Sequence, residues 1–265
     1  MKRDWLAPLG AVGLLVLYTA VYVWQPGGQD RLVTISHVLY AAFALLAAAL
    51  AMRAAFTFDR GRPQRRAWVL IGTGLVCWAT AEILWAYCQI FRPVEVPSPS
   101  PADILWLVGY IPIVVGMVVY YRPLSMAANR RRKLIALTLY AVLLVTTLVL
   151  VVQPLIASPV SGTTLRSFAN MLYPIADLCL ALISTLSLLV LCGGLIGQPW
   201  RSVVISMLLF ALADLLYAYG VGNQTYMVGR NLLSGIVDTA YLFGYVEAAM
   251  GGYRQVTLRV LPSDA

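Results

Sequence analysis

The sequence ADILWLVGY at residues 102–110 recurs as VDTAYLFGY at residues 237–245, an offset of 135. The acid, the aromatic residue at the fifth position, the glycine and the final tyrosine are kept. The preceding stretch matches at an offset of 132, where Trp78, Glu82, Trp85 and Tyr87 correspond to Phe210, Asp214, Tyr217 and Tyr219. This internal similarity predicts a repeated helical unit. Each copy has acids among aromatic residues in apolar segments.

The composition indicates a membrane protein. Of all residues, 61% are hydrophobic and 11% are charged, and the mean hydropathy is +0.81. A water-exposed surface would need more charge. Because about 20 apolar residues cross a bilayer as a helix, we expect an all-α polytopic fold with eight transmembrane helices. These are 6–24, 33–54, 67–90, 102–121, 134–153, 167–192, 202–221 and 231–250.

The basic residues predict the orientation of these helices. In the eight-span arrangement, Arg31, Arg92, Arg166 and Arg230 fall on one side of the membrane, and the other 15 of the 19 Lys and Arg residues fall on the opposite side. Basic loops are retained in the cytoplasm, so both termini should be cytoplasmic. We expect the first apolar run to be a retained helix rather than a cleaved signal peptide, because no convincing small-residue cleavage site follows it.

Two halves of four helices each are predicted, residues 1–128 and 129–265, within one integrated membrane domain. An even number of spans in each half gives both halves the same orientation, which is a parallel repeat about an axis along the membrane normal. The second half differs in one respect, since it has Asp177 where the first has Ala44.

The acids share helix faces with aromatic residues, because positions three, four and seven apart lie on one face. In the predicted orientation they lie at similar depth in the outer half of the bilayer, so we expect an outward-facing acid–aromatic cavity. The candidate ligand-binding residues are Glu82, Trp85, Asp103, Trp106, Tyr110, Asp177, Asp214, Tyr217, Asp238, Tyr241 and Tyr245.

Several states are open to these acids. Asp103 completes a Ser-x-x-Asp capping box with Ser100 at the start of its helix. The acids could be protonated, pair with arginines at the outer helix ends, accept hydrogen bonds from tyrosine hydroxyls across helices, or receive a cationic or hydroxyl-rich ligand beside aromatic rings. An acidic side chain inside a membrane is energetically unfavourable, so these acids are the first candidates for a functional role.

Absent motifs narrow the chemistry. His37 is the single histidine, and Lys2 and Lys133 are the only lysines. We therefore expect no bis-histidine haem, no histidine-rich metal site, no retinal Schiff base and no cofactor. No catalytic residues are assigned, and enzyme activity is not expected, although paired acids would suffice for acid–base chemistry on lipids. Nucleic acid is not an expected partner, because the basic residues sit in short loops at the membrane.

Residues 78–87 (WATAEILWAY) and 97–110 (PSPSPADILWLVGY) resemble the multi-span membrane input domains of bacterial and archaeal signalling proteins. Those domains precede diguanylate-cyclase or histidine-kinase modules, and they share an aromatic–acid helix, a Pro-Ser-rich Ala-Asp loop and a tyrosine-rich helix. The resemblance implies a sensory membrane fold without implying a ligand. The similarity does not extend to an output module.

We therefore expect a membrane-embedded sensor or ligand-binding module for a small molecule or lipid, in the cell membrane of a prokaryote. The basic loops 58–66 and 122–133 are the expected contacts for a cytoplasmic signalling partner or for membrane lipid. The alternatives are a small-molecule or ion transporter or channel, favoured by the duplication, a structural subunit of a membrane complex, and a lipid-modifying enzyme.

Overall fold

The chain is helical throughout the part that the structure describes, which is residues 6–91, 99–125, 129–157, 164–190 and 197–258 of a computed structural model. No strand occurs within these ranges. The elements in chain order are α1 (Leu6–Trp24), α2 (Gln29–Ala55), α3 (Pro63–Phe91), α4 (Pro101–Ser125), α5 (Arg130–Thr147), the π-type turn η1 (Leu148–Val152), α6 (Gln153–Ala157), α7 (Thr164–Val190), α8 (Gln198–Gly222) and α9 (Leu232–Leu258).

Seven of the described helices, namely α1 to α5, α7 and α8, are long and apolar enough to cross a membrane. The all-helical fold expected from the sequence is thus confirmed for the described residues, with helices of the length and apolarity that membrane spans require. The eighth predicted span, 231–250, is the 27-residue helix α9, which contains Asp238, Glu247 and Arg254 and is not among these seven. It packs against α8, α2 and α1, so much of its surface faces protein rather than lipid.

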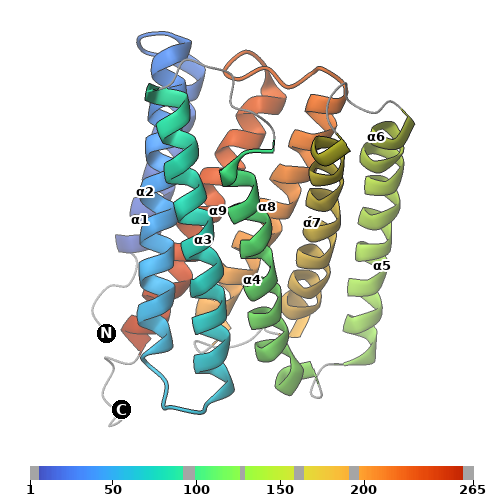
Figure 1. The fold of residues 1–265 in the computed structure, drawn as a ribbon. Helices are drawn as coiled ribbons and strands as arrows, with labels where there is room; N and C mark the ends of the chain where they lie inside the picture. Colours follow the sequence, from blue (N-terminus) through green and yellow to red (C-terminus); the bar gives the residue numbers. More distant parts are fainter. Residues whose placement is uncertain (1–5, 92–98, 126–128, 158–163, 191–196, 259–265) are drawn as a thin grey trace.

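The long helices stand side by side and alternate in direction (Figure 1). The start of α1 and the end of α9 lie toward the same end of the bundle. Helix α3 packs against α2 and α4, and α8 packs against α7 and α9. Two further contacts, α2 with α9 and α4 with α7, close the bundle. The α2–α9 pair and the α4–α7 pair therefore each join a helix from the first half of the chain to one from the second.

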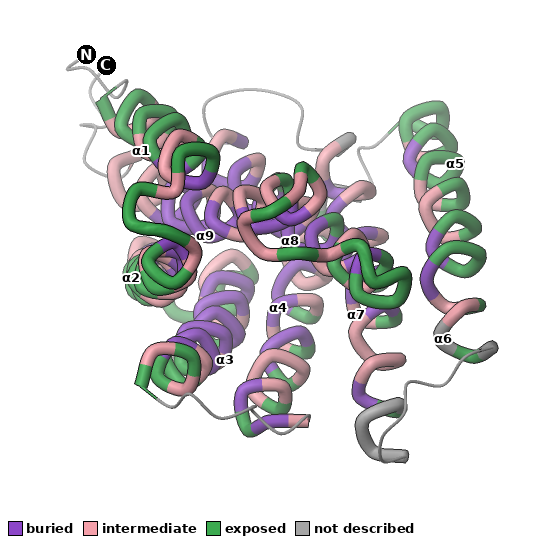
Figure 2. Tube along the Cα trace, turned by 90° about the horizontal axis from the view of Figure 1, so that it is seen from above, coloured by how far each residue is buried: buried purple, intermediate pink, exposed green. Residues whose placement is uncertain are grey.

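Burial increases toward the middle of the bundle. Seen from above, the buried positions gather on α3, α8 and α9, while α1 and α5 at the two sides are mostly exposed or intermediate (Figure 2). Exposed residues of α5 such as Leu139, Val142 and Val145 are apolar, as a surface in contact with lipid requires. Buried polar residues, among them Glu82, Asp177 and Asp238, lie in the interior of the bundle.

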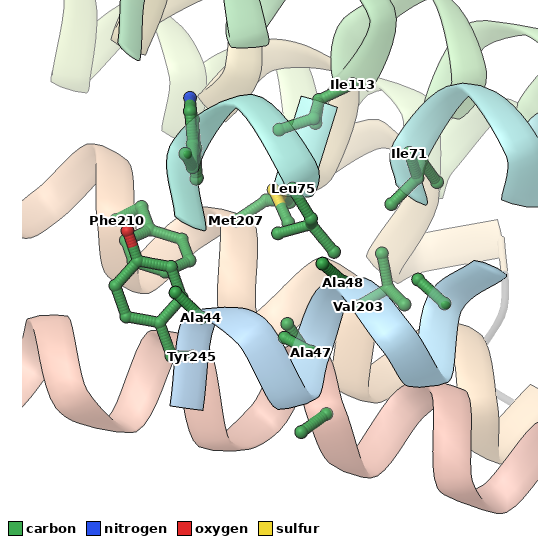
Figure 3. Close-up of a cluster of buried hydrophobic side chains, with 14 of the residues drawn as sticks. Ala44, Ala47, Ala48, Ile71, Leu75, Ile113, Val203, Met207, Phe210 and Tyr245 are labelled. Atoms are coloured by element: carbon green, nitrogen blue, oxygen red, sulfur yellow. The ribbon is translucent and has the colours of Figure 1, made fainter. Parts of the chain in front are cut away.

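Small residues bring the central helices together. Ala44, Ala47 and Ala48 on α2 are buried beneath Leu75 and Met207 of α3 and α8 (Figure 3). Without a hydrophobic driving force between helices in lipid, such close packing supplies much of the association energy. The face of α2 against α3 and α9 is built from alanine for this reason.

Glycines permit the closest approaches. A Cβ atom on Gly109 of α4 would lie 2.5 Å from the Trp78 ring of α3, and one on Gly244 of α9 would lie 2.8 Å from the Phe210 ring of α8. In the same way, Gly116 approaches the Ala67 carbonyl oxygen, and Gly251 approaches that of Pro199. The α3–α4 and α8–α9 pairs are therefore packed in the same manner.

The helix ends differ from the predicted spans. The predicted span 134–153 is divided into α5, the π-type turn and α6. Pro154 has no N–H and its ring cannot sit against the carbonyl four residues earlier, and the wider turn immediately before it accommodates this. Helices α3 and α9 run past the predicted ends at 90 and 250, because a helix can continue beyond its apolar stretch. Most of the predicted loop 92–101 lies outside the described residues.

The glycine packing gives a stability prediction. Gly109→Ala should lower the free energy of unfolding by roughly 1–3 kcal/mol, because the added methyl group meets both the buried Trp78 ring and the Gly74 carbonyl oxygen. The matched control is Gly13→Ala on α1, where a Cβ has nothing within 4 Å and helix propensity adds up to about 1 kcal/mol. Reversible denaturation in detergent measures both. Equal effects of the two substitutions would contradict this packing.

Candidate functional site

Three acids and three tyrosines meet between the middle helices. We call this group the central cluster, and it consists of Glu82 on α3, Tyr110 on α4, Asp177 on α7, Asp214 on α8, and Tyr241 and Tyr245 on α9. Exposure falls to 8% for Glu82 and 1% for Asp177. Five helices therefore contribute polar groups to one buried place.

Tyr110 lies between two acids. Its hydroxyl oxygen is 2.5 Å from Asp177 Oδ1 and 2.8 Å from Asp214 Oδ2. The other oxygen of Asp214 accepts a hydrogen bond from the Tyr241 hydroxyl. Both distances are within the range of O–H···O hydrogen bonds. Helices α4, α7, α8 and α9 are thus tied together through Asp214 and its neighbours.

The Tyr245 hydroxyl donates to Glu82 Oε1 over 2.8 Å. The Trp106 side chain also lies against Glu82, and the Trp78 Nε1–H donates to the Trp106 carbonyl oxygen over 2.9 Å. The Glu82 carboxyl is therefore enclosed by aromatic residues of α3, α4 and α9.

The two halves of the cluster have matching contacts. Tyr245 and Tyr110 are corresponding residues of the sequence repeat, and so are Glu82 and Asp214. Each tyrosine donates to the acid that belongs to the other stretch, Tyr245 to Glu82 and Tyr110 to Asp214. Their rings pack alike as well, with centroids 5.1 Å apart for Trp78 and Tyr110 and 4.7 Å apart for Phe210 and Tyr245.

Asp238 has its own group of partners. Tyr22 donates to Asp238 Oδ2 over 2.8 Å, Tyr226 donates to Oδ1 over 2.6 Å, and Tyr40 donates to the Asp238 carbonyl oxygen over 3.0 Å. Tyr226 stands in the connection between α8 and α9, where burial and then the Asp238 charge raise the pKa of its hydroxyl. It therefore stays a hydrogen-bond donor, and α1, α2 and this connection are held to α9.

Asp103 plays two roles. Its Oδ2 accepts from the Ser100 N–H at 2.6 Å and from the Ser100 hydroxyl at 2.8 Å, which is the predicted cap at the start of α4. Its Oδ1 accepts from the Tyr173 hydroxyl of α7 at 2.9 Å. The cap interpretation is confirmed, and the same carboxylate also joins α4 to α7.

Tyrosine hydroxyls are thus the partners of the acids within the described residues. This was one of the alternatives open from the sequence. The sequence did not single out the donors Tyr22, Tyr40, Tyr173 and Tyr226. One signal for them exists, because Tyr40 and Tyr173 occupy corresponding places at an offset of 133.

The other candidate residues lie around these groups. The rings of Trp85 and Trp106 pack with centroids 5.8 Å apart. Tyr217, expected beside Asp214, is 42% exposed and its ring packs on Tyr226 with centroids 4.8 Å apart. A position three residues along a helix is rotated by about 60° from the first, which suffices to turn Tyr217 outward while Asp214 faces the interior.

The carboxyl groups of the central cluster lie within hydrogen-bond distance of tyrosine hydroxyls. A hollow of about 500 Å³ lies elsewhere, at the start of α3, and it is lined by Arg60, Gly61, Arg65, Arg66, Val69 and Leu70. In the described part of the chain, no three His, Cys, Asp or Glu side chains are placed to hold a metal ion. One carboxyl oxygen, Asp177 Oδ2, is buried without a hydrogen-bond partner among these residues.

Comparison with known proteins found no match to this chain among protein-family models, curated proteins or solved structures. The function of the protein is therefore inferred from the geometry of its two groups of acids.

The cluster gives a prediction on stability. Tyr245→Phe should lower the free energy of unfolding by roughly 1–2 kcal/mol, because it removes the hydroxyl that donates to buried Glu82. Tyr219→Phe serves as the control, since Tyr219 is 37% exposed on α8, and such surface changes stay within about 0.5 kcal/mol. Equilibrium unfolding in detergent compares the two. A Tyr245→Phe protein as stable as the control would show that this bond contributes nothing.

Proposed function

We propose that the chain crosses the membrane eight times as a parallel four-plus-four repeat, with residues 1–128 and 129–265 as its halves. Reciprocal contacts support the repeat. The Tyr110–Asp214 and Tyr245–Glu82 bonds exchange corresponding residues. Corresponding aromatic residues also face each other, with ring centroids 5.0 Å apart for Trp68 and Trp200. A pseudo-twofold axis between α3 and α8 accounts for both.

The proposed orientation places both termini in the cytoplasm, as the arginine distribution favours. Green fluorescent protein fused after residue 265 should be fluorescent, and alkaline phosphatase at the same place should be inactive, because the first matures only in the cytoplasm and the second only outside it. Fusions within the turn that follows α1, after Gly28, should behave in the opposite way. An active phosphatase at the C-terminal position would reverse the orientation.

We propose further that the protein is a membrane-embedded sensor that binds a cationic or hydroxyl-rich small molecule, or a lipid headgroup, at the central cluster. The observation that carries the proposal is that the Tyr110–Asp214 and Tyr245–Glu82 bonds join one half of the chain to the other. A cation or hydroxyl group can take the place of a tyrosine hydroxyl at a carboxylate, and the surrounding rings add cation–π attraction.

The same bonds suggest how binding would be reported. A ligand shifts a conformational equilibrium by the difference between its affinities for the two states. A molecule that replaces Tyr110 on Asp214 favours an arrangement in which the two halves are no longer held by that bond. The change would reach the inner loops 58–66 and 122–133, whose basic residues suit a cytoplasmic signalling partner or anionic lipid of a prokaryotic cell membrane. The hollow beside Arg60, Arg65 and Arg66 belongs to the first of these loops.

The binding proposal predicts a retained molecule. Native mass spectrometry of the protein in lipid nanodiscs should reveal a bound species. The double variant Glu82→Gln with Asp214→Asn should retain at least about tenfold less of it, because amides of the same shape lack the negative charge that holds a cation. Glu247→Gln is the control, since Glu247 lies outside the cluster near the inner end of α9.

Two results would contradict binding at this site. One is the absence of any retained species other than bulk lipid from the wild-type protein. The other is equal retention by a double variant whose unfolding temperature matches that of the wild type. A double variant that fails to fold, with no species on the wild type, would assign the acids to helix packing alone.

Transport is a second candidate, favoured by two prolines beside the cluster. Pro112 follows Tyr110 by two residues on α4, and Pro174 lies three residues before Asp177 on α7. A proline within a helix removes a backbone hydrogen bond and allows bending, and α4 and α7 pack on each other. Flux through proteoliposomes that is abolished by Glu82→Gln would favour transport over sensing.

A further inference from the structure

The Tyr110 hydroxyl makes two contacts with carboxyl groups but has one hydrogen to donate. A tyrosine hydroxyl has one hydrogen to donate, and an ionised carboxylate can only accept. Yet the Tyr110 oxygen lies within hydrogen-bond distance of two carboxyl groups, 2.5 Å from Asp177 and 2.8 Å from Asp214. If both acids were ionised, one of these contacts would be two oxygens facing each other with no hydrogen between them.

The number of partners decides which acid carries the additional hydrogen. Asp214 accepts from two tyrosines, Tyr110 and Tyr241, one at each carboxyl oxygen. Asp177 meets one hydroxyl, that of Tyr110 at Oδ1, and its carboxyl group also lies beside that of Asp214. Its Oδ2 is buried without a hydrogen-bond partner among the described residues, and its exposure is 1%. An unpartnered oxygen in the interior is far less costly on a neutral acid than on a carboxylate. The negative charge therefore belongs on Asp214 and the hydrogen on Asp177.

We propose that Asp177 is a proton-binding site, with its bound proton donated to the Tyr110 oxygen while the Tyr110 hydrogen is donated to Asp214. Both carboxyl contacts of the Tyr110 oxygen are then satisfied with the hydrogens available. The ligand is a single exchangeable proton. The inference concerns the charge state of the cluster and does not depend on which molecule the proposed sensor binds.

The groups around Asp177 support this assignment. Those that face it are Tyr110 on α4, Asp214 on α8, Tyr241 on α9, and Tyr173 of its own helix, which is bonded to Asp103. None of these residues is basic. A second negative charge on Asp177 would thus meet Asp214 at close range in a medium of low dielectric constant, where like charges repel strongly.

The corresponding position in the other half shows that the packing does not need an acid here. Ala44 occupies this place in the first half, with 0% exposure. There, Tyr245 meets the single acid Glu82, and one hydroxyl hydrogen serves one carboxyl oxygen. Asp177 is thus an addition to a scaffold that is complete without it, which favours a role for its proton over a role in packing.

The experiment is infrared difference spectroscopy of the protein in lipid at neutral pH. A protonated carboxyl gives a C=O stretching band that a carboxylate lacks, and ¹³C labelling of aspartate shifts the aspartate bands alone. We expect a labelled, protonated aspartate band that moves on transfer to deuterium oxide. It should be lost in Asp177→Asn and in Asp177→Ala, which copies Ala44, and kept in Asp238→Asn.

A further variant tests the pairing even if both Asp177 substitutions fail to fold. Tyr110→Phe removes the hydroxyl that accepts the proton, so the band should move to higher frequency without disappearing. The proposal is overturned if the wild type shows no protonated aspartate, if the band persists in a folded Asp177 variant, or if Tyr110→Phe leaves its frequency unchanged.

Discussion

A carboxyl group placed inside an apolar bundle must find its hydrogen bonds from the protein, because lipid offers none. Tyrosine is suited to this task, since it brings an apolar ring and a single donor at its tip. Glu82, Asp214 and Asp238 each accept from tyrosines on other helices. These bonds join α1, α3, α4, α8 and α9 to one another, and any function of the acids depends on them.

Close packing of the helices allows the tyrosine hydroxyls to reach the acids on neighbouring helices. The glycines of α4 and α9 lie directly against the Trp78 and Phe210 rings, and these rings in turn contact Tyr110 and Tyr245. A larger residue would push the helices apart by more than a hydrogen bond tolerates. The packing of small residues and the polar contacts are thus two consequences of one helix spacing.

In the proposed repeat, Asp177 stands where the first half has the small residue Ala44. Tyr245 meets one acid, Glu82, whereas Tyr110 meets two, Asp214 and Asp177. The Tyr110 hydroxyl therefore has one hydrogen for two carboxyl contacts. Tyr110 lies on α4 and meets α7, and both helices contain an internal proline. An imbalance of charge and hydrogen bonding at such a place is typical of functional sites, where a structure departs from what packing alone would select.

Composition and the length of the apolar runs by themselves predicted the all-helical fold and its long apolar helices, because the length of an apolar run must match the bilayer. The Ser100–Asp103 cap could also be predicted from the sequence, because its two residues are only three positions apart. Only the tertiary structure decided which groups satisfy the acids. Tyr22 and Asp238, 216 residues apart, meet through packing of α1 on α9, and no local pattern encodes that distance. The outward turn of Tyr217 likewise depends on helix rotation, which the neighbouring helices set.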